Sequence, residues 1–500
     1  MNNKPLEALQ VVDRLTVGPV RLEPSRLIAP YTLSVGGTDH VNELIYSYEE
    51  AVFDPEERES LNLAAVIASQ VALNYGLFCR EMRFIGEYEE LDRDFLEEMA
   101  ANTAREIYVH KVLKPTGFLV GEAANQSPFR SESYLQAKIV LKAQVPRTAE
   151  NEKYWRALDR RGCAVLSSGG KDSLLSFGLL NEVDGPIHPI FINESGRHWF
   201  TALNAYRYLR NADPLTARVW TNADRLFNWV LRHLPFVRSD YQRIRADIYP
   251  IRLWTVAVFL FGALPLLRKR GVGRLVIGDE YDTTRLEYYE GIPHYDGLYD
   301  QSLHFDRALT HYYAQKGWKV EQFSVLRSVT EILIEKILLE RYPELQRNQV
   351  SCHAARVVES RVYPCGKCEK CRRIVSLLVA LGADPGRCGY NQEQVAGCLR
   401  SLREKGIHQE AEDVEDLYML LQSRGMLSPS ATAQANRRID SSILKIRFDD
   451  FRAPAQCIPE DLRRPLYNVF AEHSDGAVRK VKGGWADVDI IEALKAAGSF

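Results

Sequence analysis

Six consecutive residues in the first half of the chain have the side chains and the backbone freedom to hold a phosphate group. They are Ser168, Gly169, Gly170, Lys171, Asp172 and Ser173. Paired glycines let the backbone approach an anion closely, the serines add hydroxyl donors, and Lys171 could supply positive charge. The spacing differs from the GxxxxGK[ST] loop of P-loop enzymes. The alternatives are a Gly/Ser-rich turn of an ordinary α/β domain and, for Lys171, a solvated loop lysine.

The flanking residues predict that this turn joins a strand to a helix. The apolar run 163–167, which includes Leu166 and Ser167, is typical of a buried strand, and apolar residues recur at helical spacing over 174–180. A helix that begins here would direct its first N–H groups and the positive end of its dipole at the anion. We therefore expect Leu166, Ser167 and the six residues of the turn to bind nucleotide phosphates.

Apolar strands alternate with helices from about residue 156 to 390, which is the pattern of a parallel, doubly wound sheet. The pattern predicts strands at 163–167, 187–193, 218–220 and 274–278, a helix at 199–209 and a buried helix at 249–267. Ligands of open α/β sheets bind at the carboxyl ends of the strands. Residues 192–195 and 278–282 should therefore lie at the same edge as the glycine turn.

Carboxylates gather after the fourth of these strands, where Asp279, Glu280 and Asp282 fall within four consecutive residues. Carboxylate oxygens there could hold Mg²⁺ beside a triphosphate, as could Asp172 in the turn itself. A helix cap or a solvated loop is the alternative for this acidic group. Tyr281 could stack on a planar heterocycle or belong to an aromatic surface loop.

Four cysteines later in the chain have the spacing of a metal site. Cys365, Cys368 and Cys371 form two overlapping CxxC steps, and Cys352 lies thirteen residues before Cys365. Four thiolates are the ligand set of a structural Zn²⁺, and an iron–sulfur cluster is the competing interpretation. The basic residues within 367–373 would screen the negative charge of such a site or face an anionic substrate.

The composition is that of an ordinary soluble globular protein, with 46% hydrophobic and 26% charged residues. A chain of 500 residues is expected to form about two or three domains. The formal net charge of −2 does not favour nucleic acid as a partner. The longest apolar run, 253–267, is too short to span a bilayer, and residues 1–5 do not resemble a signal peptide. We expect a cytoplasmic protein without membrane contact.

The two flanking regions carry no motif for chemistry. Residues 1–155 are expected to form an α+β accessory domain that recognises a partner or substrate. Its predicted elements are strands at 15–17, 20–22 and 31–35 and helices at 61–72 and 95–107. Cys79 and His110 are interpreted as packed residues. Residues 391–500 are expected to be mainly helical, with helices at 395–402, 414–421 and 488–494, a linker at 428–436 and a strand at 443–448.

The pattern SGGxDS at a strand–helix junction resembles the PP-loop of the N-type ATP pyrophosphatases, which split ATP between the α- and β-phosphates. Followed by the four-cysteine pattern, it resembles the 7-cyano-7-deazaguanine synthase (QueC) family over about residues 160–380. The resemblance implies a HUP-like PP-loop domain at 156–390, ATP, Mg²⁺ and a structural Zn²⁺. It also implies adenine beside Phe191 and Asn193, and a deazapurine substrate enclosed by the segment that contains Asp300.

The reaction implied by the resemblance is adenylation of a carboxylate, 7-carboxy-7-deazaguanine, followed by attack of an amine. Lys171, Asp172 and Ser173 are then the expected catalytic residues. The long flanking regions favour an acceptor larger than ammonia, such as an amine of a partner protein, as in QueC-like proteins of type IV CBASS antiphage systems. The alternatives are a standard synthase of queuosine biosynthesis, a tRNA-modifying enzyme and a non-catalytic nucleotide sensor. A dimer is one oligomeric state that we consider.

Overall fold

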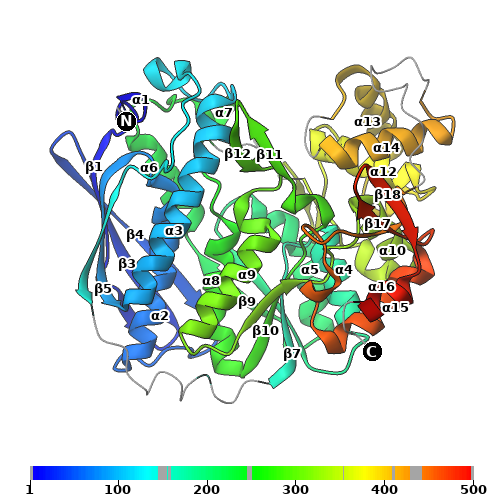
Figure 1. Ribbon diagram of the computed structural model, residues 1–500, viewed down its shortest axis with the longest axis horizontal. Coiled ribbons are helices and arrows are strands. Elements are labelled where there is room, and N and C mark those ends of the chain that lie inside the picture. Colours follow the sequence, from blue (N-terminus) through cyan, green and yellow to red (C-terminus); the bar gives the residue numbers. More distant parts are fainter. Residues whose placement is uncertain are drawn as a thin grey trace.

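The computed structural model describes residues 4–144, 155, 159–244, 250–352, 354–407, 411–427 and 442–496. Its main feature is an eleven-stranded mixed sheet, most of whose neighbouring strands are parallel (Figure 1). The strand order is β13-β10-β7-β8-β9-β4-β3-β1-β5-β6, and β2 pairs with β3. The chain therefore has the α/β class expected from its sequence.

Five neighbouring strands at one end of this sheet are parallel to one another. They are β7 (Asp159–Leu166), β8 (Ile187–Asn193), β9 (Ala217–Thr221), β10 (Val272–Ile277) and β13 (Glu321–Ser324). The predicted strands at 163–167, 187–193, 218–220 and 274–278 are confirmed. Because β7 lies between β8 and β10, the chain order along the sheet reverses at β7. Such a reversal point is where open α/β sheets bind their ligands.

Helices cover both faces of these strands, because successive side chains of a strand point to opposite sides. Cys163 and Val165 of β7 share one apolar core with residues of α4 (Lys171–Leu180), α5 (His198–Ala212) and α10 (Glu331–Arg341). Ala164 and Leu166 belong to the other core, which includes α8 (Val256–Arg270). The helix expected over 249–267 is α8, but it begins only at Val256 and continues past Pro265.

The N-terminal region continues the same sheet. Strand β4 (Thr38–Tyr48) pairs antiparallel with β9, with Tyr46 opposite Thr221 and Tyr48 opposite Val219. The side chain of Asn222 extends this ladder, since it accepts from the Ile45 N–H at 2.8 Å and donates to the Glu43 carbonyl at 2.8 Å. Strands on both sides of the expected boundary near residue 155 are therefore hydrogen-bonded to each other.

The expected N-terminal strands and helices are present, but their bounds differ from those expected. The elements are α1 (Lys4–Glu7), β1 (Val12–Val17), β2 (Arg21–Glu23), β3 (Arg26–Val35), α2 (Arg58–Ser69), the 3-10 helix η1 (Gln70–Tyr75), β5 (Cys79–Tyr88), α3 (Glu90–Ile107), the π-helix η2 (Tyr108–Leu113), η3 (Gly121–Asn125) and β6 (Lys138–Gln144). Elements β1, β3 and α3 are longer than expected, β2 is shifted by one residue, and the helix expected at 61–72 ends at Ser69 and is followed by a 3-10 helix. In Figure 1 these elements lie at the end of the molecule opposite the C-terminus.

The middle of the chain adds short elements around the parallel strands. They are α6 (Ala223–His233), α7 (Tyr241–Ile244), η5 (Tyr281–Thr284), the hairpin of β11 (Leu286–Tyr289) and β12 (Ile292–Tyr295), η6 (Tyr299–Gln301), α9 (Leu303–Gln315), α11 (Pro343–Gln346), and the hairpin of β14 (Arg356–Val358) and β15 (Arg361–Tyr363).

The C-terminal region combines helices with a small sheet that the sequence indicated only in part. Its elements are α12 (Glu369–Ala380), η7 (Pro385–Cys388), α13 (Gln392–Lys405), α14 (Ala411–Ser423), η9 (Ala455–Cys457), α15 (Glu460–His473), α16 (Ile490–Ala496), and the sheet of β16 (Ile446–Phe448), β17 (Ala477–Val481) and β18 (Gly484–Val488). The expected linker at 428–436 lies outside the described residues.

Candidate functional site

The glycine turn connects β7 to α4 at the carboxyl end of the sheet, as its sequence predicted. Helix α4 begins at Lys171, with Gly170 as its N-cap residue. Hydrogen bonds of two serine hydroxyls stabilise the turn. Ser167 Oγ lies 3.2 Å from Ser173 Oγ and accepts from the Gly169 N–H at 3.4 Å. The first N–H groups of α4 and the positive end of its dipole therefore face the space above the strand, an arrangement that suits an anion.

Two glycines in this region occupy positions where a side chain has no room. Gly169 has a φ of +75°, and a Cβ atom there would lie 2.7 Å from the carbonyl oxygen of Thr201 in α5. Gly278, which follows β10, approaches the backbone of Asp172, and a Cβ atom would lie 2.8 Å from its carbonyl carbon. The turn and the acidic segment after β10 are thus packed directly against each other.

Lys171 is buried and forms ion pairs with three carboxylates. Its Nζ lies 2.6 Å from Asp172 Oδ1, 2.9 Å from Glu280 Oε2 and 3.5 Å from Glu331 Oε1. Burial would lower the pKa of Lys171, but Asp172, Glu280 and Glu331 outweigh it and hold this pKa well above its ordinary value. Lys171 is therefore a charged interior group, and the interpretation as a solvated loop lysine is wrong.

Glu331, at the start of α10, connects Lys171 to a second cation. Arg373 of α12 donates from Nε to the two carboxylate oxygens of Glu331 at 2.9 and 2.8 Å. Burial alone would raise the pKa of Glu331, but Arg373 and Lys171 lower it below its ordinary value. Glu331 was not among the predicted site residues, because nothing in the local sequence marks it. Its partners lie 160 positions before it and 42 after it.

A cavity of about 460 Å³ opens between the turn, the acidic segment, α5, α8 and α12. Among the predicted site residues, its lining includes Leu166, Ser167, Ser168, Gly170, Lys171, Asp172, Ser173, Asp279, Glu280 and Asp282. It also includes Lys370, Arg373 and Ile374 of α12, and Asp296 and Gly297, which follow β12. The volume falls in the range of small-molecule sites. The turn and the acidic segment thus share one cavity.

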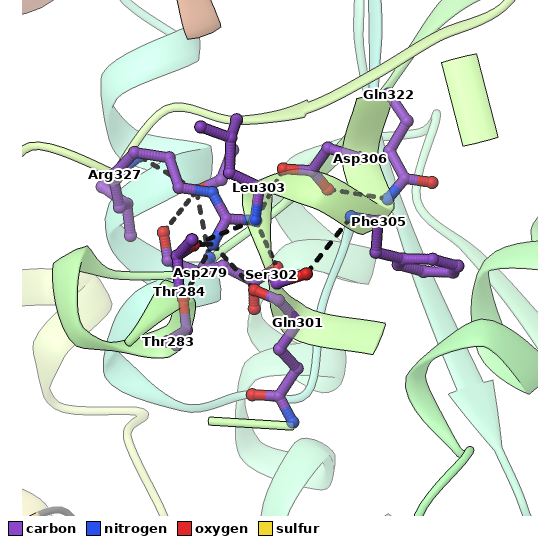
Figure 2. A network of polar contacts seen from close by, with 12 residues as sticks. Asp279, Thr283, Thr284, Gln301, Ser302, Leu303, Phe305, Asp306, Gln322 and Arg327 are labelled. Carbon is purple, nitrogen blue, oxygen red and sulfur yellow. Dashed lines mark hydrogen bonds and ion pairs between the residues drawn. The ribbon is translucent and has the colours of Figure 1, made fainter. Parts of the chain in front are cut away.

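A buried arginine holds the acidic segment in place (Figure 2). Arg327, which follows β13, has no exposed side-chain surface. Its Nη2 lies 3.2 Å from Asp279 Oδ2 and 2.6 Å from Asp306 Oδ2, and its Nη1 donates to Thr283 Oγ1 and to the Gln301 carbonyl at 2.7 Å each. One guanidinium therefore fastens the segment after β10 to η5, η6 and α9.

The acidic segment is an interior structure. Asp279, Glu280 and Asp282 are all buried, and so is Tyr281 between them. The alternatives of a solvated acidic loop and of an aromatic surface loop are therefore wrong. Tyr281 does not line the cavity, and its hydroxyl donates to Asp449 Oδ2 at 2.9 Å.

A buried ion-pair group forms another part of the wall, at the end of β8. Arg252 pairs with Glu194 and, at 2.7 Å, with Asp224 Oδ1, and His198 Nδ1 lies 3.1 Å from Glu194 Oε1. Burial and the nearby Arg252 lower the pKa of His198 well below its ordinary value, which favours the neutral imidazole. Glu194 falls within the expected edge segment 192–195, but its partner Arg252 had no signal in the sequence.

The residues predicted for adenine lie beside the cavity and do not line it. Phe191 is fully buried and packs edge-to-face on Tyr206 of α5, with ring centroids 5.4 Å apart. Asn193 uses its side-chain oxygen to accept from the Ser195 N–H at 3.0 Å. Ile192, between them, is the residue of this strand that reaches the cavity lining.

Asp300, the predicted substrate residue, lies at the N-terminus of α8. Its Oδ2 accepts from the N–H groups of Thr255, Val256 and Ala257 at 3.0, 2.9 and 3.3 Å. A carboxylate in this position satisfies the first free donors of a helix and favours a helix start. This contact gives a physical reason why α8 begins at Val256.

Replacing Asp300 by asparagine is expected to flatten the pH dependence of stability. Burial raises the pKa of Asp300 to about 7, although the three N–H donors oppose this shift. An unfolded aspartate has a pKa of about 3.9, so the folded state holds the proton more tightly. The contribution of Asp300 to stability is therefore largest below about pH 4 and is lost as pH rises to about 7.

Urea unfolding at several pH values measures this effect. We expect the fall in unfolding free energy between about pH 4 and 7 to be about 3 kcal/mol smaller in Asp300→Asn than in the wild type. The exposed Asp184→Asn is the matched control and should keep the wild-type profile. If the unfolding free energies of Asp300→Asn and the wild type depended on pH in the same way, a raised pKa of Asp300 in the folded state would be contradicted.

The four predicted cysteines come together and could hold a metal ion. Their sulfur atoms all lie within 4.8 Å of one another. Three Sγ separations are 3.5 Å for Cys368 and Cys371, 3.6 Å for Cys352 and Cys368, and 3.8 Å for Cys365 and Cys371. Tetrahedral thiolates at about 2.3 Å from Zn²⁺ are about 3.8 Å apart. The cluster fits a single ion better than an iron–sulfur cluster, which would spread the sulfurs further.

The cysteine cluster lies next to the cavity wall. Cys368 is the N-cap residue of α12, whose residues Lys370 and Arg373 line the cavity. On the other side, Val350 donates its N–H to the Gly169 carbonyl at 3.5 Å, two residues before Cys352. A metal ion bound here would therefore fix the position of two cavity segments relative to the glycine turn.

The chain matches no family model, no curated protein and no solved structure. Among the described residues, none of the helices has both the length and the apolar character needed to cross a membrane. Its function must therefore be inferred from the chemistry of the cavity.

Proposed function

We propose that this protein is an ATP-dependent ligase of the ATP pyrophosphatase type, which adenylates a carboxylate and transfers the acyl group to an amine. The observation that carries the proposal is the position of the β7–α4 turn. It lies at the point where the strand order reverses, opens into a cavity of about 460 Å³, and has the buried Lys171 beside it. Fold and motif alone would permit other reactions, so the proposal rests on the geometry of this site.

The turn is suited to hold pyrophosphate. Backbone N–H groups at the start of α4 and the hydroxyls of Ser168 and Ser173 would donate to the phosphate oxygens. Lys171 would stabilise the negative charge that builds as the bond between the α- and β-phosphates breaks. Donors fixed before the reaction act most strongly in a site that excludes water. The side chains here are held by ion pairs and helix packing, which supports such preorganisation.

The charge of the cavity supports a requirement for Mg²⁺. Seven carboxylates line it, against Lys171, Lys370 and Arg373 in the lining and Arg252 and Arg327, which pair with two of the seven. A triphosphate added to this excess of negative charge would be repelled unless cations accompany it. Asp172, Glu280 and Asp282 provide the oxygen ligands that Mg²⁺ prefers. When bound, the ion would neutralise phosphate charge and orient the oxygens.

The acyl substrate in this proposal is 7-carboxy-7-deazaguanine, on the resemblance to the QueC family. The amine acceptor is a protein amine, as in the antiphage systems, because the chain extends well beyond the parallel strands on both sides. Three alternatives are distinguished from this proposal by experiment. They are a standard nitrile-forming synthase with ammonia as the amine, a tRNA-modifying enzyme, and a nucleotide sensor.

Product analysis tests the proposal. Purified protein is incubated with ATP, Mg²⁺ and 7-carboxy-7-deazaguanine, with and without ammonium. AMP and pyrophosphate formed only with the deazapurine would support adenylation. A nitrile would then indicate the ordinary synthase, and a mass adduct on a co-expressed protein would indicate conjugation. ADP and phosphate, or no deazapurine-dependent turnover, would contradict the proposal.

Asp172→Asn separates an enzyme from a sensor. We expect turnover to fall about 100-fold or more, because a charged oxygen ligand for Mg²⁺ and an ion-pair partner of Lys171 are lost. The matched control is Asp184→Asn, an exposed aspartate just after α4, which should keep wild-type turnover. ATP binding that persists in Asp172→Asn, combined with no turnover in the wild type, would indicate a nucleotide sensor.

A further inference from the structure

A second group of metal-ligating side chains lies away from the cysteines, where the N-terminal helix α3 and its π-helical extension η2 meet the β11–β12 hairpin. It consists of Glu106, His110 and His294, whose ligand atoms all lie within 4.8 Å of one another. Glu106 and His294 are buried, and the His110 side chain is 15% exposed. The two imidazole rings meet edge-to-face, with centroids 4.7 Å apart.

The local structure explains how these three side chains converge. Glu106 and His110 are four residues apart on one continuous helical segment, so both point from the same face. The helix changes to π geometry at Tyr108, between them, and ends at Leu113. His294 comes from β12, whose next residue, Tyr295, donates its N–H to Glu106 Oε2 at 3.2 Å.

We propose that Glu106, His110 and His294 form a second metal site, which binds a divalent transition-metal ion such as Zn²⁺. Two imidazole nitrogens and one carboxylate oxygen are a common three-residue ligand set for this ion, with water completing the coordination. Glu106 supplies the negative charge that a buried cation needs. His110 Nε2 lies 3.5 Å from Glu106 Oε2 and 3.0 Å from the Tyr295 carbonyl. Binding of an ion by this nitrogen would replace its contact with the Tyr295 carbonyl.

The position of the site indicates what the ion would do. Asp296 and Gly297 directly follow β12 and line the cavity. An ion shared by α3, η2 and β12 would fasten the hairpin to the N-terminal region and hold this part of the cavity wall. The role that we assign to the ion is to position this wall, and it does not depend on which reaction the cavity performs.

Metal counting on the full-length protein tests the proposal. The protein is loaded with excess Zn²⁺, freed from loosely bound ions with a weak chelator, and analysed for zinc per chain by plasma mass spectrometry. His110→Gln and His294→Gln should each bind one zinc fewer than the wild type, whatever the four-cysteine cluster holds. The matched control His311→Gln, at an exposed histidine of α9, should keep the wild-type content.

Hydrogen exchange gives a second measurement that needs no variant. Zinc added to metal-depleted wild-type protein should slow exchange over residues 286–297, since the ion ties the hairpin to α3 and η2. Wild-type zinc content in both histidine variants would overturn the proposal. Unchanged hydrogen exchange of the hairpin after zinc addition would also overturn the proposal. This second measurement uses only the wild-type protein, so it remains informative if a variant fails to fold.

Discussion

Replacing Gly169 by alanine is expected to lower the ATP-dependent activity proposed for this protein by about 100-fold or more. The residue has a φ of +75°, which L side chains rarely adopt, and its Cβ atom would lie 2.7 Å from both the Thr201 carbonyl oxygen and the Ala202 Cα of α5. Neither backbone atom can move without shifting the helix, so the turn must move instead. A displacement of about 1 Å in a positioning group can cost about 100-fold in rate. We expect at least this loss in pyrophosphate release.

The control for this experiment is Gly397→Ala, the same change in the middle of α13. No atom lies within 4 Å of the Cβ position there, and alanine favours a helix over glycine by about 1 kcal/mol. Gly397→Ala should therefore keep full activity and unfold at a slightly higher temperature. Activity in Gly169→Ala equal to that of Gly397→Ala would show that the turn does not position the phosphates.

Replacing Arg327 by methionine is expected to cause a large loss of stability. Methionine fills much of the arginine volume but leaves Asp279 and Asp306 buried without their cation. Removing one partner of a buried ion pair costs about 3–5 kcal/mol. Chemical denaturation with urea measures the loss directly.

The pH dependence of this loss identifies its cause. Burial raises the pKa of Asp279 and of Asp306, and Arg327 opposes both shifts. Without Arg327 both folded-state pKa values rise further, so the folded state increasingly loses stability as pH rises. The deficit of Arg327→Met should therefore be larger at about pH 8 than at about pH 5.

Arg238→Met is the matched control, because Arg238 also forms a two-pronged pair, with Asp240, but at the surface. Exposed pairs contribute little to stability, so this variant should unfold like the wild type at both pH values. A deficit of Arg327→Met that does not depend on pH would indicate lost packing rather than unpaired carboxylates.

Local patterns in the sequence predicted the parallel strands well. Strand β8 was expected at 187–193 and has those bounds, since its apolar run follows a Gly-Pro turn. The pairing of β4 with β9 could not be predicted, because it joins residues more than 170 positions apart. The start of α8 was also misplaced, since Asp300, whose side chain accepts from the first N–H groups of this helix, lies 44 positions after Val256.

The candidate site likewise has parts that local sequence predicts and parts that it does not. The turn at 168–173 and the four cysteines were predicted because the residues of each motif lie close together in the sequence. Lys171 was identified, but its ion pair with Glu331 and the link from Glu331 to Arg373 are long-range contacts between separate elements. Arg327 and His294 had no local signal at all. The parts of the site that could not be predicted from the sequence are therefore mainly ion pairs between residues far apart in the chain.

The pairing of β4 with β9 has a consequence for how the protein can be divided. An open parallel sheet ends in a strand whose outer N–H and C=O groups can pair with any other chain, which is a common origin of aggregation. Here the N-terminal residues cover that edge of β9, from Val219 to Thr221. A fragment that begins after residue 144 would expose this edge, and a strand of another chain could then pair with it. The N-terminal region therefore protects an edge of the sheet, in addition to any partner that it recognises.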